Sequence, residues 1–573
     1  MIMKKLLLVL SVFALFSQNI DAKTITPAEA KAIAQQQFMS QTRLNASPVN
    51  MTLSYQAMNL MGQTDYYVFN RDGGQGFVIV SGDDVAAPIL GISDKGSFDI
   101  NLAPEPLKYM LEEYSHQLEW LRNNPEEVPS LRYNPAGVMP ICGNAYGECP
   151  HWHQFAPYNN NCPTSSGGRC VAGCAPIAFA HIMKGLQHPY RGVGENSYTC
   201  IIDGVEKTIS SNFANHIYKY SSMKNGYKES QSAPEVSQLV FDAGVAFNTK
   251  YSTSSSDAAY RDIIKGMIAY FDYNPDVQFT LKANYTEQNW QDMIYNEIDN
   301  GRPVYYFGYR TIGNDGAQCR IGHAFVVDGY NAQGQVHVIW GFQPEEYNAY
   351  FDFSLLSPRI YGDTPYEHDE YAEGFNAEQG AIIGICPDTT DRGGIVVKAV
   401  NLVQETMPAN DVRATIEVQA LSGKYAGTLR YGIVSKTSAS PYYSTQYYFT
   451  ADVDLEDNGI ATIDLSGAYP YLSEGQTYYI VVWSPYFSNN YDWMWFLGEP
   501  VPFTVGDWVT PPDPQFILGD VNGDGNVTIA DVTELIDIIL LEGEYVEAGD
   551  IDANGSLTIA DVTALIDMLL FPE

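Results

Sequence analysis

The fold depends on the stretch Gly173-Cys174-Ala175-Pro176-Ile177-Ala178-Phe179-Ala180-His181-Ile182-Met183. Apolar residues cover almost the whole circumference of the helix that this spacing predicts, so the helix is expected to run through a core. Pro176 is tolerated only in a first helical turn, which puts Cys174 at or just before the N-terminus. The unpaired N–H groups and dipole there favour an anion, and the pKa of a thiol can fall from about 8.5 towards roughly 3.5–7.5. The stretch therefore predicts a thiolate nucleophile on a rigid support.

A cysteine nucleophile needs a base, and His323 is the strongest candidate. It is a polar residue inside the apolar run Ile321 to Gly329, which is typical of a central strand buried on both faces. Burying an imidazole costs free energy unless it is hydrogen-bonded, so a partner is expected. The order Cys174 then His323 matches that of papain-like proteases, although an isolated cysteine or histidine is more often a packing residue.

Two further residues are candidates for the same site. The turn Asn331 to Gly334 predicts a hairpin that returns Trp340 to a position roughly opposite His323, where its ring would cover the imidazole or simply fill the core. His337, near that turn, is expected to be structural or exposed. Gln154 precedes Cys174 in a loop, and its amide can donate to an oxyanion together with the Cys174 backbone N–H. Such a donor contributes about 3–4 kcal/mol in a transition state.

The ends and the composition of the chain predict its location. Residues 1–22 contain Lys4 and Lys5, then the apolar run Leu6 to Phe16, which is the pattern of a secretory signal and is too short to span a membrane. No later stretch has the length of a membrane helix. We therefore expect a protein that is secreted or held at the cell surface. The formal net charge of −37 argues against nucleic acid as a partner. Eight cysteines permit disulfides, but their pairing cannot be read from the sequence.

Residues 23–135 are predicted to form a separate α+β unit. Helices are expected over Pro27 to Gln41 and Leu107 to Leu121, with strands at Tyr66 to Phe69 and Gly76 to Val80. The Pro- and Asn-rich stretch Asn123 to Pro140 is typical of an exposed linker. A folded unit before a nucleophile domain fits a pro-domain, and an ordinary binding domain fits this pattern equally well.

Residues 393–508 alternate in the manner of short strands, such as Ala414 to Val418 and Tyr478 to Trp483, separated by turns such as Glu456 to Gly459. This pattern predicts an immunoglobulin-like β-sandwich. A spacer and a ligand-binding domain are both compatible with it.

The last segment, residues 516–573, contains one pattern twice, thirty residues apart. Each copy has oxygen side chains at loop positions 1, 3, 5 and 12 and glycine at position 6, which is the spacing of a calcium loop with Asp as its twelfth residue. A backbone carbonyl would fill position 7. Each loop leads into an apolar helix, so a small all-α module with two Ca²⁺ ions is expected. The predicted ligands are Asp520, Asn522, Asp524, Asn526 and Asp531 in the first loop, and Asp550, Asp552, Asn554, Ser556 and Asp561 in the second.

These motifs resemble those of the streptopain-like (interpain-like) cysteine peptidases. The resemblance rests on Gly173 to Lys184, on Gly322 to Gly329, on Trp340-Gly341 and on Trp152 to Asn159, with Gly76 to Gly91 similar to the family's pro-domain. It implies a papain-like fold over residues 136–388, a latent zymogen inhibited by its own pro-domain, and endopeptidase activity on proteins or peptides. It also implies the roles of the site residues: Cys174 as nucleophile, His323 as general acid/base, Gln154 as oxyanion donor and Trp340 as the shield of the histidine. No cofactor is needed for this chemistry.

The paired calcium loops resemble dockerin modules, which implies a cohesin-type partner. A calcium-stiffened tail without a partner is the plain alternative. The whole chain is thus expected to be an α+β multidomain protein.

The sequence also departs from the peptidase pattern. Ile339 stands where relatives often have asparagine, so the group that orients His323 is open, and the segment Phe342 to Glu346 replaces a glycine-rich wall. Cys170 is a rival nucleophile without a helix directly after it. Two other classes therefore remain: a catalytically impaired papain-like scaffold that acts as a binding protein, and a Cys/His amidase acting on cell-wall peptides.

Overall fold

The computed structural model describes residues 23–41, 49–124, 136–145, 147–312, 319–356, 378–436, 443–486, 496–508, 517–523, 526–541 and 545–570. The expected secretory signal, residues 1–22, and the predicted ligand Asp524 lie outside these ranges. Contacts divide the chain into two compact units, the first containing Met1–Asn401, Thr415–Asp464 and Ile480–Val501, and the second containing the remaining segments. Across the described residues, no helix is both long enough and apolar enough to cross a membrane.

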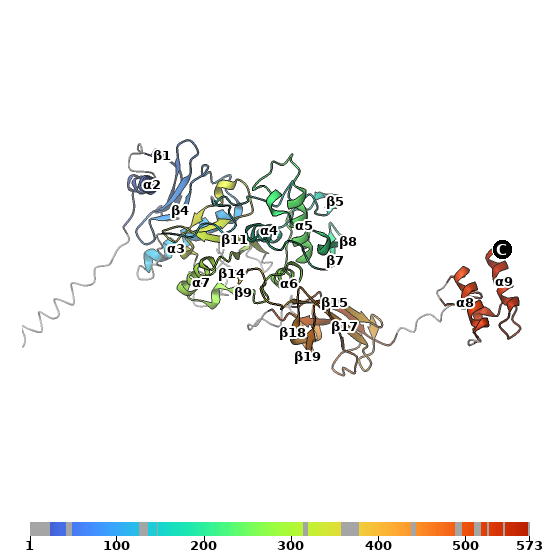
Figure 1. Ribbon diagram of the computed structural model, residues 1–573. Helices are drawn as coiled ribbons and strands as arrows, with labels where there is room; N and C mark the ends of the chain where they lie inside the picture. The colour runs from blue at the N-terminus through green and yellow to red at the C-terminus, as the bar shows by residue number, and fades with distance from the viewer. Residues whose placement is uncertain are drawn as a thin grey trace, which may run out of the picture. The chain divides into compact units, whose positions relative to one another are not determined.

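A ten-stranded sheet forms the centre of the first unit, with the order β1-β2-β3-β4-β13-β12-β11-β10-β14-β9 (Figure 1). Its strands are β1 (Met51–Met58), β2 (Thr64–Arg71), β3 (Phe77–Ser81), β4 (Ile89–Ser93), β9 (Gln278–Leu281), β10 (Val304–Ile312), β11 (Cys319–Tyr330), β12 (Val336–Ile339), β13 (Tyr350–Phe351) and β14 (Glu378–Ile383). Strands β1–β4 come from the N-terminal region and the others from the region that contains Cys174 and His323.

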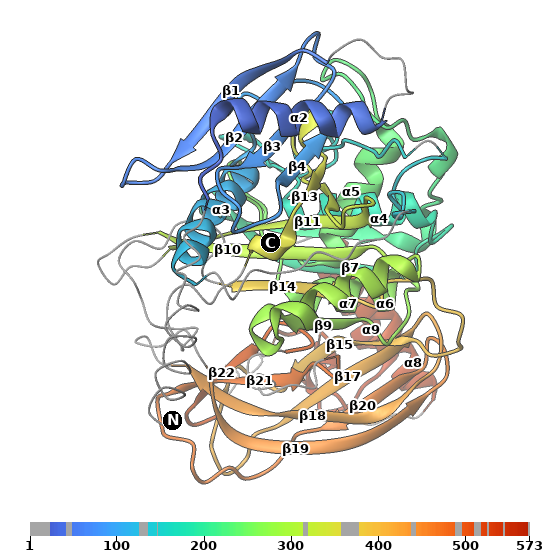
Figure 2. The same cartoon turned by 90° about the vertical axis from the view of Figure 1, so that its left-hand side faces the viewer.

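The N-terminal strands are covered by two helices, α2 (Pro27–Gln41) and α3 (Glu105–Asn123). Side chains alternate along a strand, so one face of β2 and β3 packs against α2 and the other against α3. Figure 2 shows α2 and α3 with these strands. The predicted α+β character of this region is confirmed.

The next α-helices along the chain are α4 (Cys174–Leu186), α5 (Pro234–Ala246), α6 (Tyr260–Phe271) and α7 (Glu287–Asp299). Helix α4 packs against β11 and α5, and its residues from Ala175 to Met183 are all buried, as its apolar circumference predicts. Two small hairpins belong to the same region, β5 (Thr164–Ser165) with β6 (Gly168–Arg169), and β7 (Glu195–Ile202) with β8 (Val205–Asn212). The largest core is therefore built around the helix that Cys174 begins.

The N-terminal strands and the strands around His323 belong to one sheet because β4 pairs with β13. The register joins Ile92 to Tyr350 and Gly91 to Phe351. A side chain on Gly91 would contact Phe351 at 3.0 Å, so the small residue permits this approach. The two regions therefore share backbone hydrogen bonds as well as side-chain contacts.

Further strands form two sheets of the orders β15-β17-β20 and β16-β22-β21-β18-β19. They are β15 (Gly394–Leu402), β16 (Thr406–Met407), β17 (Ala414–Leu421), β18 (Tyr425–Lys436), β19 (Tyr443–Leu455), β20 (Ile460–Asp464), β21 (Thr477–Trp483) and β22 (Val501–Val505). The predicted strands are present, and the immunoglobulin-like type stays a prediction.

The C-terminal segment contains α8 (Ile529–Leu540) and α9 (Ile559–Leu570), which pack on each other through a small apolar cluster that includes Val532, Leu535, Val562 and Leu565. Both helices follow the repeated loops, as predicted. The α+β class of the chain is thus confirmed.

Candidate active site

Helix α4 begins at Cys174, where the position of Pro176 predicts its start. The residue before it, Gly173, has φ 91°, a conformation that favours glycine, and a Cβ there would lie 3.0 Å from the Ser256 carbonyl oxygen. The glycine therefore lets the chain turn sharply into the helix and leaves the cysteine at its first position.

The sulfur of Cys174 lies against β11. The backbone N–H of Ala324, the residue after His323, points at the thiol, as do the N–H groups of Cys174 and Ala175. These donors lower the pKa of the thiol, but burial outweighs them and raises it to about 11. The expected fall in the pKa of Cys174 is therefore wrong for this state of the molecule. The free energy of desolvating the thiolate is larger than the stabilisation that the helix N-terminus gives it.

His323 lies in β11 and is almost fully buried. Its Nε2 is 2.7 Å from the Trp340 carbonyl oxygen, which can only accept, so Nε2 carries the proton and Nδ1 the lone pair. Burial lowers the pKa of this imidazole to about 4, although the Trp340 carbonyl favours its protonated form. At neutral pH the site therefore contains a thiol and a neutral imidazole.

His323 is next in sequence to Ala324, the residue of β11 whose backbone N–H faces the Cys174 thiol. Ala324 belongs to the core built on α4, whereas Phe325 belongs to the core on the other face of the sheet. His323 stacks near Phe325 at 6.2 Å between ring centroids and against Phe342 at 5.1 Å. The structure thus brings Cys174 to the backbone of β11 directly beside His323.

Trp340 contributes its backbone to the site. Its indole is buried against Phe325 at 4.8 Å and Phe351 at 5.9 Å between ring centroids, and the ring that lies against the imidazole of His323 is that of Phe342. The backbone N–H of Trp340 donates to Asn348 Oδ1 at 2.9 Å. This bond restrains the residue whose carbonyl accepts from His323. Ile339 is buried in the core of α4, so the orienting group that its identity left open is the Trp340 carbonyl. Phe342 was not among the predicted site residues, and its apolar side chain directly after Trp340-Gly341 was the signal that could have identified it.

Gln154 is anchored close to the start of α4. Its backbone carbonyl accepts from the Ala172 N–H at 2.9 Å, two residues before Cys174. Asn159 Nδ2 ties the same loop to the Cys170 carbonyl at 2.9 Å, and Cys170 itself is fully buried. The rival thiol at Cys170 is therefore withdrawn from the surface, and Gln154 lies in the loop beside the nucleophile.

A cavity of about 870 Å³ lies beside this loop. One side is formed by His151, His153 and Phe155, and another by Gln343 to Glu346, the segment that departs from the peptidase pattern. His151 Nδ1 lies 2.6 Å from Glu345 Oε2 and bridges the two sides. The residues that line the cavity are thus neighbours in sequence of Gln154 on one wall and of Phe342 on the other.

The repeated loops form a second candidate site, for a cation. Carboxylate oxygens of Asp550, Asp552 and Asp561 lie within 4.8 Å of one another, which suits a hard cation that takes oxygen ligands. Asp561 Oδ1 accepts from the Ile551 N–H at 3.0 Å, and Asp531 accepts from the Val521 N–H at 2.9 Å in the first loop. The twelfth-position aspartates thus close both loops in the same way. Of the other predicted ligands, the structure describes Asp520, Asn522, Asn526, Asn554 and Ser556 in the two loops.

Comparisons with known proteins match three regions of the chain. The sequence model of the peptidase C10 family matches residues 152–351, that of the Spi protease inhibitor matches residues 22–118, and that of the dockerin type I domain matches residues 518–570. Dockerin type I domains normally bind calcium.

Several relatives are thiol proteases. The thiol protease/hemagglutinin PrtT of Porphyromonas gingivalis is 27% identical over 410 residues, which cover 69% of this chain and 45% of that protein. Streptopain of Streptococcus pyogenes is 28% identical over 355 residues, which cover 58% of this chain and 83% of streptopain. The chain thus spans less than half the length of PrtT.

Two solved structures from Prevotella intermedia are also similar. A fragment of prointerpain A is 26% identical with a TM-score of 0.46, covering 60% of this chain and 100% of the fragment. Active interpain A cysteine protease is 30% identical with a TM-score of 0.36, covering 44% of this chain and 96% of interpain A. The chain thus contains a peptidase C10 domain, with a Spi inhibitor-like domain before it and a type I dockerin domain after it.

Proposed function

We propose that the chain is a secreted or cell-surface cysteine endopeptidase with a papain-like site, made as a latent zymogen. His323 takes the Cys174 proton at Nδ1, and the thiolate attacks a peptide carbonyl to form a tetrahedral intermediate. The Gln154 amide and the Cys174 N–H donate to its oxyanion. His323 then gives the proton to the leaving amine and activates the water that releases the acyl group.

One observation carries this proposal: Cys174 begins α4 with its sulfur on the Ala324 N–H, and the preceding His323 is held by the Trp340 carbonyl. A carbonyl partner fixes the tautomer that leaves Nδ1 able to accept a proton. Ile339 is the feature that favoured a catalytically impaired scaffold, and the Trp340 carbonyl removes the reason for it.

Latency is supported by contacts of the inhibitor-like domain with residues on both sides of Trp340 in the sequence. The Ser93 hydroxyl donates to the Glu346 carbonyl at 2.9 Å, and Gln335 Nε2 donates to the Ile89 carbonyl at 2.6 Å. The Tyr114 hydroxyl donates to the Asp352 carbonyl at 2.6 Å. These bonds restrain the wall that carries Phe342, the ring over His323, so release of the inhibitor-like domain would free that wall.

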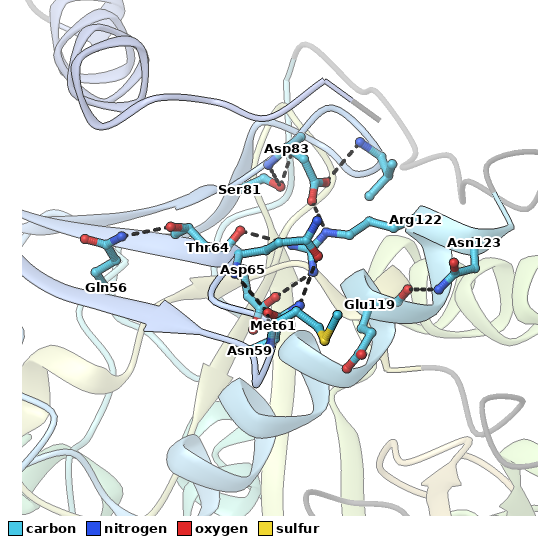
Figure 3. A network of polar contacts seen from close by, with 12 residues as sticks. Gln56, Asn59, Met61, Thr64, Asp65, Ser81, Asp83, Glu119, Arg122 and Asn123 are labelled. Carbon is cyan, nitrogen blue, oxygen red and sulfur yellow. Dashed lines mark hydrogen bonds and ion pairs between the residues drawn. The ribbon is translucent and has the colours of Figure 1, made fainter. Parts of the chain in front are cut away.

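The inhibitor-like domain is itself closed by a buried cation. Arg122, near the end of α3, has Nε 2.6 Å from Asp83 Oδ2 and Nη1 2.8 Å from Asp65 Oδ1, and it donates to the Thr64 carbonyl at 3.0 Å (Figure 3). Breaking one side of such a buried pair leaves an uncompensated charge, at a cost of about 3–5 kcal/mol. We infer that this network keeps the domain folded up to the segment that separates it from the peptidase domain.

The dockerin domain is proposed to bind two Ca²⁺ ions through the two loops and to dock on a cohesin-type partner. The carboxylate cluster of Asp550, Asp552 and Asp561 supports the second ion, and the matching hydrogen bonds of Asp531 support the first. Proteins or peptides are the proposed substrates of the peptidase domain.

The test is the mass and N-terminal sequence of the purified chain after incubation, compared with the Cys174→Ala variant. A cut near residues 123–145 in the parent and an intact variant would support both activity and latency. Labelling by an epoxide or chloromethyl-ketone inhibitor should occur in the processed parent and disappear in Cys174→Ala. Labelling that survives in Cys174→Ala, or casein left uncleaved by processed protein, would contradict the proposal.

A further inference from the structure

Three chemically matched side chains, Cys149, Asp328 and His337, gather near the start of the peptidase domain. Cys149 Sγ is 3.8 Å from Asp328 Oδ2, and His337 Nδ1 is 2.7 Å from Asp328 Oδ1. The ligand atoms of Cys149, Asp328 and His337 all lie within 4.8 Å of one another. Asp328 is 0% exposed and His337 is 6% exposed, so these polar groups are held inside the protein. The thiol of Cys142 lies near Asp328 but outside this group of three, so its side chain would have to turn toward an ion to reach it.

A β-bulge at Asp328 directs its side chain toward Cys149 and His337. In the pairing of β11 with β12 the register shifts between Val327 and Gly329, so Asp328 is the extra residue of a β-bulge. Bulges redirect a side chain out of the alternation of its strand. The Cys142 N–H donates to Asp328 Oδ2 at 2.8 Å, and the Ile141 N–H donates to the Asp328 carbonyl at 2.8 Å. The segment that precedes the matched peptidase region is therefore held on the strand that carries His323.

We propose that Cys149, Asp328 and His337 bind a Zn²⁺ ion, with Cys142 as the fourth ligand. Two sulfurs, one imidazole nitrogen and one carboxylate oxygen form a set that suits Zn²⁺ and is poorly suited to Ca²⁺ or Mg²⁺. At Zn–S and Zn–O lengths of about 2.3 and 2.1 Å, tetrahedral ligands lie about 3.6 Å apart, close to the 3.8 Å between Cys149 Sγ and Asp328 Oδ2. The nitrogen and oxygen of His337 and Asp328 would separate to about 3.4 Å.

Binding balances as a proton exchange. Each thiol releases one proton to solvent and becomes a thiolate ligand, and the proton on His337 Nδ1 moves to Nε2 so that the Nδ1 lone pair can bind the ion. In the part of the chain that the structure describes, Cys142 and Cys149 both carry free thiols, although the Asn144 N–H closes their loop on the Glu148 carbonyl at 3.1 Å. The ion would join this loop to β11 and β12, the strands that lead to His323 and Trp340. It would thereby fix the start of the peptidase domain after the inhibitor-like domain leaves.

The test uses the full chain with Cys174→Ala, which cannot process itself by the proposed mechanism, purified under reducing conditions in calcium-containing buffer. Elemental mass spectrometry is expected to find about one zinc per chain. Cys149→Ser and Cys142→Ser should each retain at least about tenfold less zinc, because a thiolate ligand is lost. Cys386→Ser, which removes a half-buried thiol outside the cluster, is the matched control and should retain the zinc of the parent.

Cobalt gives an independent readout that does not depend on activity. Co²⁺ bound in place of zinc should show a thiolate-to-cobalt charge-transfer band in the parent and in Cys386→Ser, but not in Cys149→Ser; the oxygen ligands of the calcium loops cannot produce this band. Circular dichroism of each variant shows whether it is folded. If Cys149→Ser does not fold, Cys142→Ser takes its place in the test. Equal zinc in parent and Cys149→Ser, or no zinc in the parent, would overturn the proposal. An intact mass that shows a Cys142–Cys149 disulfide in the parent would overturn it too.

Discussion

The calcium loops and the peptidase site are built in opposite ways. Each loop takes its ligands from a short continuous segment, such as Asp550 to Asp561, with the spacing of the chain setting which oxygens converge. The peptidase site takes Gln154, Cys174 and His323 from segments far apart in the sequence, and a sheet and a helix bring them together. A local site depends on the ion that it binds, whereas an assembled site depends on the core behind it.

The difference extends to electrostatics. The loop carboxylates are held by backbone N–H groups in an arrangement that suits a cation. His323 is instead buried among apolar side chains and Cys174 is partly buried, and desolvation raises the pKa of the thiol to about 11 and lowers that of the imidazole to about 4. We infer that forming the thiolate–imidazolium pair requires a change around the site, such as release of the inhibitor-like domain.

The largest expected effect separates the two cysteines of the assembled site. Cys174→Ala should lower kcat/KM for a casein-derived peptide by at least about 10⁴-fold, because the nucleophile is lost. Cys170→Ala should retain activity in proportion to the amount of folded protein. Activity measurements on both variants, with active-site titration by an irreversible inhibitor, check this. Inactivity of a well-folded Cys170→Ala together with an active Cys174→Ala would reverse the assignment.

Calcium removal tests whether the local site is independent of the assembled one. EDTA should abolish the helical signal of an isotope-labelled α8 and α9, because acidic loops without a cation repel one another. Peptide hydrolysis should change little once Zn²⁺ is restored, because EDTA also removes the proposed zinc ion. Asp561→Ala should reproduce the effect for its loop, whereas Asp567→Ala, on the exposed side of α9, should not. A C-terminal segment that stays folded in EDTA would show that its apolar cluster suffices without the ion.

Loss of the proposed oxyanion donor should have a smaller effect. Gln154→Ala should lower kcat by about 10²–10³-fold with little change in KM, because the donor acts on charge that develops in the transition state. Asn160→Ala, an exposed residue of the same loop, is the control. Steady-state kinetics of the processed enzyme measure both. A rise in KM at constant kcat would assign Gln154 to substrate binding.

The smallest effect concerns a histidine inside α4. His181 is 0% exposed and stacks on Trp152 at 5.5 Å, and burial lowers its pKa to about 3. The unfolded chain binds a proton near pH 6.5 that the folded chain does not, so this group makes the folded protein lose stability as pH falls below that value. Between pH 6.5 and 5 the loss is about 1–2 kcal/mol.

His181→Gln should remove that part of the slope. Urea unfolding of parent and variant at several pH values, followed by tryptophan fluorescence in the Cys174→Ala background, measures it. The same slope in both proteins would show that His181 finds a proton acceptor on protonation.

Several features could be predicted because they depend on short-range rules. The helix Pro27–Gln41 and the start of α4 at Cys174 follow from apolar spacing and from the position of Pro176. Placement of Trp340 near His323 follows from the hairpin that joins β11 to β12. These inferences need only neighbours in sequence or across one turn.

Other features depended on the third dimension. His323 is oriented by the backbone carbonyl of Trp340, and the type of side chain at a position does not predict what its backbone atoms bind. Phe342 covers His323 only because the chain turns at Gly341. The thiol pKa was predicted from the helix N-terminus alone, and the neighbouring core decided its direction. Pairing of β4 with β13 joins segments that share no local signal.

The sequence by itself determined the nucleophile helix and the repeated acidic loops, and it predicted the resemblance to the peptidase family, since these rest on residue types at set spacings. Only the tertiary structure decided which groups face Cys174 and His323, how strongly both are desolvated, and that Cys149, Asp328 and His337 meet. Burial and long-range contacts depend on the sum of the whole core, so a one-dimensional pattern does not contain them.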